Sequence, residues 1–313
     1  MIDTDDQPKI QPLAYRIANL NVSYPKIEQV WQVLNSIRTQ NKYKEGTTKY
    51  GQRHISVIGP SGVGKSQALL KYEELNQGFT RVSADQSKEV DIKPVVYMEL
   101  PDPFTIKELY QQISYALGFP ELPRRITIGD AQRQAFYLLK EQEVEVLILD
   151  ELDYILTSNV SSKAAMNAIK KIANKANITL VLAGTPEAEE LLKINFQNYR
   201  RYPKIYIDRF EKCDEEWCKL LERMEESLAP EKPIGLGDPM TKLPQILHLM
   251  SSGLLGVLTP VLQETYSILG VFDGDHKEIT FNSETIEVLK RAYHNINGDL
   301  TIEEFTSMLE KGY

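Results

Sequence analysis

The chain has 313 residues, of which 42% are hydrophobic and 26% are charged, and its formal net charge is -8. This length suits a core domain plus a smaller one, and the composition excludes a collagen-like or disordered chain. The acidic balance excludes a protein coated all over with DNA-binding charge, so any nucleic-acid contact would come from a restricted surface.

Signals for membrane insertion, secretion and metal binding are weak. No apolar run approaches the roughly 20 residues of a membrane helix, and residues 1–10 are acidic and polar, unlike a signal peptide. We therefore expect a cytoplasmic protein without membrane contact. Cys213 and Cys218 are the only cysteines. On one helix a spacing of five residues points two thiols apart, so neither a disulfide nor a zinc site is predicted.

Helix and strand patterns alternate along the first two thirds of the chain. A helix is predicted over 24–38, a strand over 54–58 that enters a Gly-rich loop, and a helix over 67–75 after that loop. This alternation indicates an α/β fold, with a parallel sheet and helices on both faces. Further strands are expected at 94–100, 144–149 and 178–183, and further helices at 105–117, with Thr105 as its N-cap, 130–140 and 163–176.

The last third is predicted to be mainly helical. A helix is expected over 214–228, and the Gly- and Pro-containing segment 229–238 is predicted to be a linker. Helices over 243–250, 257–269 and 283–293 follow. The sequence therefore predicts an N-terminal helical extension (1–50), an α/β core (51–230), and a helical lid with a C-terminal module (231–313).

The strongest motif follows the strand over 54–58. It has the pattern Gly-x4-Gly-Lys-Ser, in which backbone N–H groups and a helix N-terminus cradle a polyphosphate. Gly62 and Gly64 allow the tight turn, Lys65 reaches the β- and γ-phosphates, and Ser66 binds Mg²⁺. ATP and Mg²⁺ are therefore the predicted cofactors. The expected nucleotide-binding residues are Gly59, Pro60, Ser61, Gly62, Val63, Gly64, Lys65, Ser66 and Gln67.

Two acids follow the strand over 144–149. Asp150 is predicted to hold the metal together with Ser66, and Glu151 to activate the attacking water. Alone, such acids are more often part of a solvated loop, but a P-loop about 85 residues upstream favours the catalytic interpretation. Asp153 fits either a partner of this site or a helix cap, and capping is slightly favoured.

Polar residues after the next strand complete the predicted site. Thr185 would orient the water or cap a helix ahead of Pro186, and the two roles are compatible. Arg200 and Arg201 are candidates for an arginine finger that reaches the nucleotide of a neighbouring copy. The alternative for this pair is a solvated basic patch.

These motifs together resemble the AAA+ superfamily of ATPases, and more narrowly the TniB/TnsC group of transposition regulators, over roughly residues 24–265. The resemblance implies an ATP-dependent homo-oligomer, a ring or a helical filament, that coats double-stranded DNA without sequence specificity. Such a protein directs a transposase, with a target-selection protein, to its target site. The most specific pieces are Leu149-Asp150-Glu151, Gly184-Thr185-Pro186, and Asn198-Tyr199-Arg200-Arg201-Tyr202 leading to Glu215-Glu216-Trp217.

The resemblance also implies DNA-facing residues between the P-loop helix and the acidic strand. The matching positions are Lys107, Arg124, Arg125 and Thr127. Their side chains suit phosphate contacts, which need charge but carry no sequence code. For Lys107, a solvated helix face is an equally supported interpretation.

One position departs from the AAA+ pattern. Many AAA+ proteins carry an arginine at the start of a lid helix after Gly-x-x-Gly, whereas Val257 follows Gly253-Leu254-Leu255-Gly256 here. This predicts slow or partner-dependent hydrolysis. Two alternatives stay open: a signalling or defence P-loop NTPase whose helical C-terminus binds protein, and an origin-binding or clamp-loader-like AAA+ protein.

Overall fold

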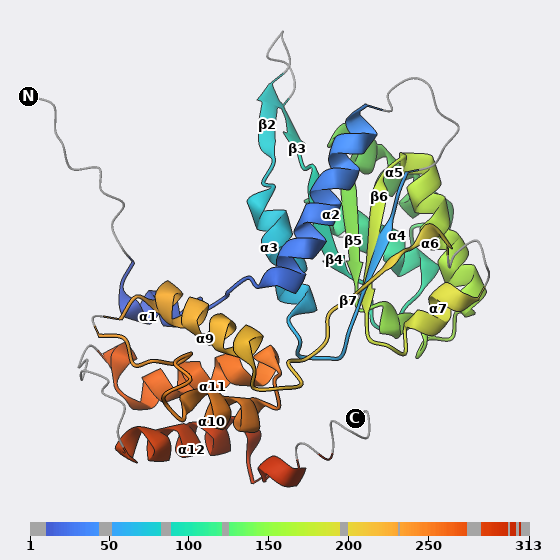
Figure 1. The fold of residues 1–313 in the computed structure, drawn as a ribbon. Helices are drawn as coiled ribbons and strands as arrows, with labels where there is room; N and C mark the ends of the chain where they lie inside the picture. Colours follow the sequence, from blue (N-terminus) through green and yellow to red (C-terminus); the bar gives the residue numbers. More distant parts are fainter. Residues whose placement is uncertain are drawn as a thin grey trace, which may run out of the picture. The chain divides into compact units, whose positions relative to one another are not determined.

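The chain folds into two compact units in a computed structural model. One unit is Pro25–Asp208, and the other combines Met1–Tyr24 with Arg209–Tyr313. The first unit holds both sheets, and the second is helical (Figure 1). The structure describes residues 11–43, 52–82, 89–120, 125–194, 200–230, 232–273, 283–299, 301–304 and 307.

The main sheet has five strands in the order β4-β5-β6-β1-β7, and every neighbouring pair is parallel. β1, β5 and β6 are buried along their whole length, which explains their continuous apolar sequences. Parallel strands place their carboxyl ends at one edge of the sheet, where open α/β folds bind ligands. The predicted fold class is confirmed. The strands are β1 (Ile55–Ile58), β4 (Val95–Glu99), β5 (Val146–Asp150), β6 (Thr179–Gly184) and β7 (Lys204–Tyr206).

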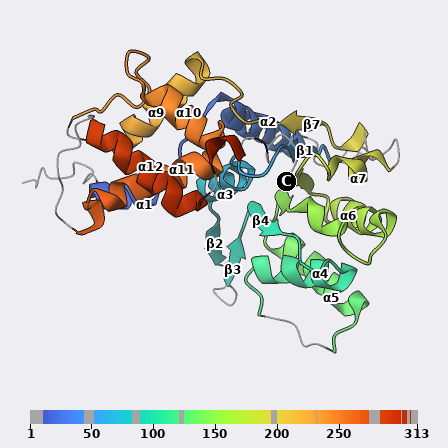
Figure 2. The same ribbon diagram turned by 90° about the horizontal axis from the view of Figure 1, so that it is seen from below.

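Helices cover both faces of this sheet (Figures 1 and 2). The apolar sides of α4, α5 and α6 form the main core with β4, β5 and β6 on one face. α2 and α3 lie on the other face. The helices are α2 (Pro25–Lys42), α3 (Lys65–Leu75), α4 (Ile106–Ala116), α5 (Ile128–Glu141) and α6 (Ser162–Ala176).

The two units divide the chain differently from the predicted domains. Residues 25–50 were expected in an N-terminal extension, but α2 belongs to the sheet-containing unit. Trp31 Nε1 on α2 donates a hydrogen bond of 2.9 Å to the Ala68 carbonyl on α3, which ties the two helices together. Residues 209–230 were expected in the core, yet they belong to the helical unit.

Three short elements escape prediction from the sequence: α1 (Leu13–Ala18), β7, and a hairpin of β2 (Phe79–Val82) and β3 (Glu89–Ile92). Every residue of β2 is exposed. An exposed strand lacks the burial that produces alternating or continuous apolar residues, so its sequence carries no periodic signal.

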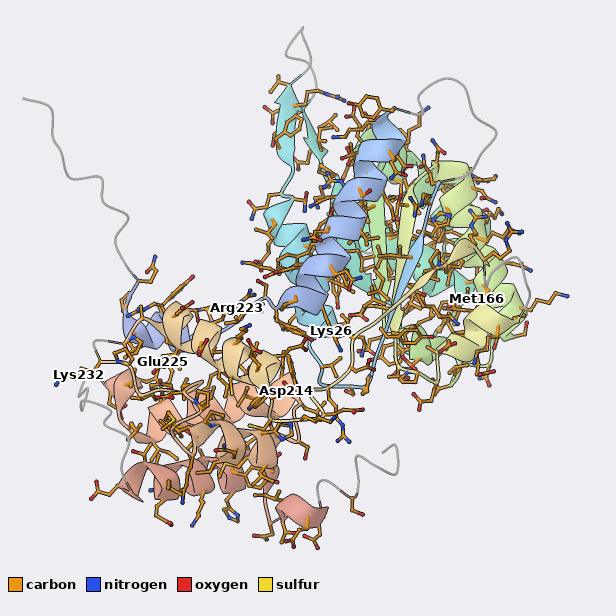
Figure 3. All side chains as sticks on the ribbon, in the orientation of Figure 1. Lys26, Met166, Asp214, Arg223, Glu225 and Lys232 are labelled. Carbon is orange, nitrogen blue, oxygen red and sulfur yellow. The ribbon has the colours of Figure 1, made fainter. Side chains whose placement is uncertain are left out.

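In the described part of the helical unit, α1 is joined by the longer helices α9 (Glu215–Leu228), α10 (Leu243–Ser251), α11 (Leu255–Ile268) and α12 (Ser283–Asn297). Buried Glu225 on α9 (Figure 3) accepts hydrogen bonds from the backbone N–H groups of Gly235 at 3.0 Å and Leu236 at 3.1 Å. The segment over 229–238 is therefore fixed on α9. Its prediction as a linker between domains is wrong, because the carboxylate satisfies backbone groups that a free linker would expose.

Within the described part of the chain, no single helix has the length and hydropathy to cross a membrane. α10 and α11 reach this length and hydropathy only when the two are taken together, and the pair is bent by 119° at the break between them. Gly253 lies in that break with a φ of +73°, and a Cβ there would lie 1.9 Å from the Phe210 carbonyl oxygen.

Candidate nucleotide site

The Gly-rich loop connects β1 to α3, as predicted. Gly59 has no room for a side chain, since a Cβ would lie 1.9 Å from the backbone oxygen of Ile207. Gly62 and Gly64 have φ values of +78° and +92°, a region that favours glycine. The loop and the first turn of α3 therefore hold every predicted nucleotide-binding residue, namely Gly59, Pro60, Ser61, Gly62, Val63, Gly64, Lys65, Ser66 and Gln67.

Lys65 opens α3, and its ammonium group is turned onto the loop. Nζ donates to the carbonyls of Gly59 at 2.7 Å and Pro60 at 2.8 Å, and the residue is 8% exposed. Burial lowers the pKa of Lys65, while three nearby carboxylates act in the opposite direction. A phosphate oxygen is a stronger acceptor than either neutral carbonyl, so the ammonium group is suited to turn towards one.

Asp150 ends β5 and is 1% exposed. Its Oδ1 accepts a hydrogen bond of 2.8 Å from the Glu151 backbone N–H, and its Oδ2 accepts one of 2.8 Å from the Tyr97 hydroxyl. The Ser66 side chain lies near the Tyr97 hydroxyl and lowers its pKa, against the larger effects of burial and of Asp150, which raise it. Tyr97 is not among the predicted site residues, and only the pairing of β4 with β5 reveals it.

Glu151 follows at the same edge of the sheet with a φ of +56°, a strained backbone for a residue with a side chain. Burial raises the pKa of its carboxyl, and the neighbouring charges of Asp150, Asp153 and Glu99 raise it further. Lys65 acts in the opposite direction. A carboxylate with a raised pKa is a better proton acceptor, which suits a general base.

Thr185 follows β6, and Asp153 holds it. The Thr185 backbone N–H donates to Asp153 Oδ2 at 2.9 Å, and its hydroxyl contacts Asp153 Oδ1 and Glu187 Oε2. The approach requires Gly184, because a Cβ there would lie 2.9 Å from Asp153 Oδ2. The slightly favoured interpretation of Asp153 as a helix cap is wrong: its carboxylate binds Thr185 instead.

The alternative role of Thr185 as a helix cap is not found. The next helix, α7 (Glu189–Lys193), has Ala188 at its N-cap and no side-chain hydrogen bond there. Thr185 follows β6, which runs parallel to β1. It therefore lies at the carboxyl edge of the sheet, as does the Gly-rich loop.

Arg200 and Arg201 precede β7, so they lie at the amino edge of the sheet, opposite the Gly-rich loop. Arg201 Nη2 donates to Asn174 Oδ1 at 2.6 Å. The pKa of nearby His54 is lowered to about 3, mainly by burial and in part by the Arg201 charge. Arg200 is exposed. The residues just before this pair, 195–199, lie outside the described part of the chain.

Helices α4 and α5 run in the same direction. Near their starts, Gln132 Nε2 donates to the Tyr110 hydroxyl at 2.6 Å. At their ends, Gln142 Nε2 donates to the Leu117 carbonyl at 2.8 Å. The N-terminal ends of the two helices therefore lie at the same end of the pair.

The predicted DNA-facing residues lie at these N-terminal ends. Lys107 is half-buried in the first turn of α4, and Arg125 is exposed just before α5. Thr127 caps α5 by accepting a hydrogen bond of 3.1 Å from the Asp130 N–H. Arg124 lies outside the described residues.

These residues fit a magnesium nucleotide. Magnesium prefers oxygen ligands, which the Ser66 hydroxyl and the Asp150 carboxylate supply. The loop before α3 places backbone N–H groups at a helix N-terminus, where the helix dipole favours a phosphate. Among the described residues, no group of three or more His, Cys, Asp or Glu side chains could hold a metal by itself. Oxygens of the nucleotide would therefore complete the coordination.

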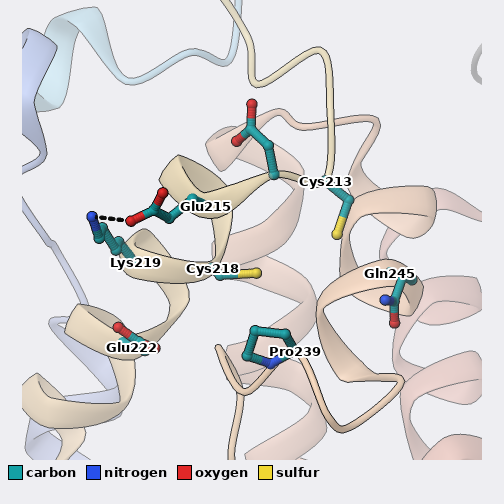
Figure 4. Close-up of a pocket in the computed structure, with 8 residues that line it drawn as sticks. Cys213, Glu215, Cys218, Lys219, Glu222, Pro239 and Gln245 are labelled. Atoms are coloured by element: carbon teal, nitrogen blue, oxygen red, sulfur yellow. Dashed lines mark ion pairs between the residues drawn. The ribbon is translucent and has the colours of Figure 1, made fainter.

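A separate hollow of about 420 Å³ lies in the helical unit (Figure 4). Cys213 precedes Asp214, the N-cap of α9, so it lies before the helix that carries Cys218. The two cysteines therefore do not share one helix, as the prediction assumed, and both are free of disulfides. Burial raises the pKa of both thiols. The lining residues are Cys213, Asp214, Glu215, Cys218, Lys219, Glu222, Pro239 and Gln245.

The fold and the site define the class of protein. A parallel sheet in this order, with a Gly-rich loop after β1, acids at the end of β5 and a threonine after β6, is an AAA+ P-loop core. The family model described as "Bacterial TniB protein" matches residues 15–212, more than half of the chain. The chain belongs to the TniB family, which confirms the predicted family.

Solved structures support the same fold. ORC1 of Aeropyrum pernix in complex with DNA is 14% identical, with 92% of this chain and 71% of that chain covered and a TM-score of 0.61. ORC2 of Aeropyrum pernix is 14% identical, covering 93% and 74%, with a TM-score of 0.56. Cdc6p from Pyrobaculum aerophilum is 15% identical, covering 94% and 88%, with a TM-score of 0.54. No curated protein matches the chain.

Proposed function

We propose that this chain is an ATP-dependent AAA+ regulator that assembles on double-stranded DNA and directs a transposase, with a target-selection protein, to its target site. One observation carries the proposal. The chain is a TniB family member whose Gly-rich loop, acids and threonine lie at one edge of the sheet, whereas its arginine pair lies at the opposite edge. A site divided in this way is suited to completion by a neighbouring copy, in a ring or a helical filament.

Each site residue has a distinct role in this proposal. Lys65 and the loop N–H groups bind the phosphates, and Ser66 and Asp150 hold the magnesium ion. Bound Mg²⁺-ATP would supply the γ-phosphoryl group whose hydrolysis ends the assembled state. Glu151 accepts the proton of the attacking water, and Thr185 orients that water. Arg200 or Arg201 of the neighbouring copy stabilises the negative charge that develops.

Two features bear on the proposed regulation and the DNA surface. Val257 lies in the first turn of α11, where other AAA+ proteins carry an arginine, which supports slow hydrolysis suited to a switch. Lys107, Arg125 and Thr127 share one end of the α4–α5 pair, which supports one common surface for phosphate contacts. Such contacts would be independent of sequence and sensitive to salt.

Binding to random duplex DNA with a non-hydrolysable ATP analogue tests the proposal. We expect binding that depends on the analogue, increases with duplex length and weakens steeply as salt rises. A Lys65→Ala variant should lose the dependence on the analogue, and a Lys107→Ala, Arg125→Ala variant should show a shallower salt dependence. Absence of binding by the unaltered chain at low salt with saturating analogue would overturn the DNA assignment.

Origin binding is the second candidate, and the likeness of fold to ORC1 solved with DNA favours it. It predicts a preference for one DNA sequence over random duplex. The signalling or defence alternative predicts instead a protein partner that is retained when Lys107, Arg124 and Arg125 are all changed to Ala.

A further inference from the structure

The Tyr97 side chain lies beside the Asp150 carboxylate because of the register of two parallel strands. β4 pairs with β5 so that Tyr97 is opposite Ile148 and Glu99 is opposite Asp150. Side chains alternate along a strand, so Tyr97 and Asp150 point to the same face of the sheet. Helix α3, which begins with Lys65 and Ser66, lies on that face. The Tyr97 phenol therefore reaches the end of β5 on the face that α3 covers.

The hydrogen bonds of Tyr97 have a defined direction. An ionised carboxylate can only accept, so the Tyr97 hydroxyl donates its one proton to Asp150 Oδ2 at 2.8 Å. The donor that holds this carboxylate oxygen therefore comes from the neighbouring strand, β4.

We propose that Tyr97 is a positioning residue for the magnesium ion of the bound nucleotide, an inference that rests on the proposed ATP binding. With Oδ2 held by Tyr97 and Oδ1 by the Glu151 N–H, the Asp150 carboxylate is fixed in one orientation. Tyr97 therefore acts through Asp150.

Two further features keep Tyr97 in place. Its backbone N–H donates a hydrogen bond of 2.8 Å to Glu73 Oε1 on α3, which ties β4 to that helix. A phenol keeps its proton near neutral pH, so the hydroxyl stays a donor to Asp150.

The change Tyr97→Phe removes only the hydroxyl, and Tyr110→Phe is its matched control. The Tyr110 hydroxyl also makes a part-buried hydrogen bond, to Gln132 on α5, away from the nucleotide site. The measurement is binding of a fluorescent ATP analogue as magnesium is titrated, with binding in excess EDTA as the baseline. Thermal unfolding in EDTA shows whether each variant is folded.

For Tyr97→Phe we expect the magnesium concentration at half-maximal binding to rise about 10-fold, the scale for loss of a residue that orients a metal ligand. Binding in EDTA and the unfolding temperature should match the unaltered chain, and Tyr110→Phe should not change the titration. If the unaltered chain binds the magnesium nucleotide and Tyr97→Phe gives the same titration, the role of Tyr97 is overturned while the proposed function stands. Failure of the unaltered chain to bind the analogue overturns the proposed function, and with it this inference.

Discussion

The two edges of the main sheet differ in what they hold. At the carboxyl edge, hydroxyl and carboxylate groups are joined in pairs, Tyr97 with Asp150 and Thr185 with Asp153. At the amino edge, Arg201 contacts the neutral side chain of Asn174 and lies near His54, whose pKa of about 3 keeps it uncharged near neutral pH. In the proposed function, the first edge binds a magnesium nucleotide and the second presents cations.

The length of β1 sets the distance between the two edges of the sheet. Four residues span about 13 Å at the usual rise per residue of a strand. An arginine at the amino edge therefore starts far from the Gly-rich loop of its own chain. In the proposed function, the two edges serve the same chemistry across a contact between copies.

Removing the arginine should have the largest effect. With duplex DNA present, we expect Arg201→Ala to lower kcat for ATP hydrolysis about 1,000-fold, as for the loss of an arginine finger. Affinity for an ATP analogue in the absence of DNA should be unchanged, because the Gly-rich loop is intact. Arg200→Ala is the matched variant. A large loss in Arg200→Ala with none in Arg201→Ala would transfer the role to Arg200.

Removing the base at the carboxyl edge comes next. Glu151→Gln keeps the shape of the side chain but cannot accept a proton, so kcat should fall about 100-fold or more. Binding of the ATP analogue should persist, in contrast to Lys65→Ala, which should lose it. Steady-state turnover with a parallel binding titration measures both. Turnover equal to that of the unaltered chain would remove Glu151 from this role.

Asp153→Asn tests the contact that holds Thr185. An amide retains the shape but is a weaker acceptor than a carboxylate for the Thr185 N–H and hydroxyl. We expect kcat to fall about 10-fold, the lower end for misplacing a positioned group, with nucleotide affinity unchanged. The control is Glu187→Gln, which alters the other acceptor of the hydroxyl. If kcat is the same in Asp153→Asn and the unaltered chain, the contact between Asp153 and Thr185 has no role in turnover.

The pH dependence of turnover should show the smallest effect. Glu151 must be deprotonated to act, and its pKa is raised above the ordinary 4.5 by burial and then by neighbouring carboxylates. The activity should therefore fall, as pH is lowered, at a pH above the ordinary pKa of glutamate. Glu99→Gln removes one of the negative charges and should move this loss to lower pH. If Glu99→Gln instead moves the loss of kcat to higher pH, the assignment of this loss to Glu151 is contradicted.

Residues adjacent in sequence were the predictable part of the site. The Gly-rich loop follows from its local glycines, because each fixes a turn or a close approach at its own position. Asp150 and Thr185 follow from the ends of buried, apolar strands. Tyr97 does not, since it lies 53 residues from Asp150 and meets it through the register of β4 with β5. Asp153 and Thr185 are likewise 32 residues apart.

The fold was predictable where burial leaves a pattern. β1, β5 and β6 are buried throughout, and their apolar runs predict a parallel sheet. The exposed β2 leaves no such pattern. The segment over 229–238 contains turn residues, but the carboxylate that accepts hydrogen bonds from its backbone N–H groups belongs to Glu225 on α9. A tertiary contact of this kind has no local signal.

The central claim, that two copies complete each site, is tested most directly by mixing two inactive variants. Arg201→Ala subunits keep Glu151, and Glu151→Gln subunits keep Arg201, so a mixed assembly contains some complete sites. With equal amounts, duplex DNA and ATP, random mixing at a head-to-tail contact predicts turnover of about one quarter of the unaltered chain. Turnover no higher than that of the two variants measured separately would contradict a site shared between copies.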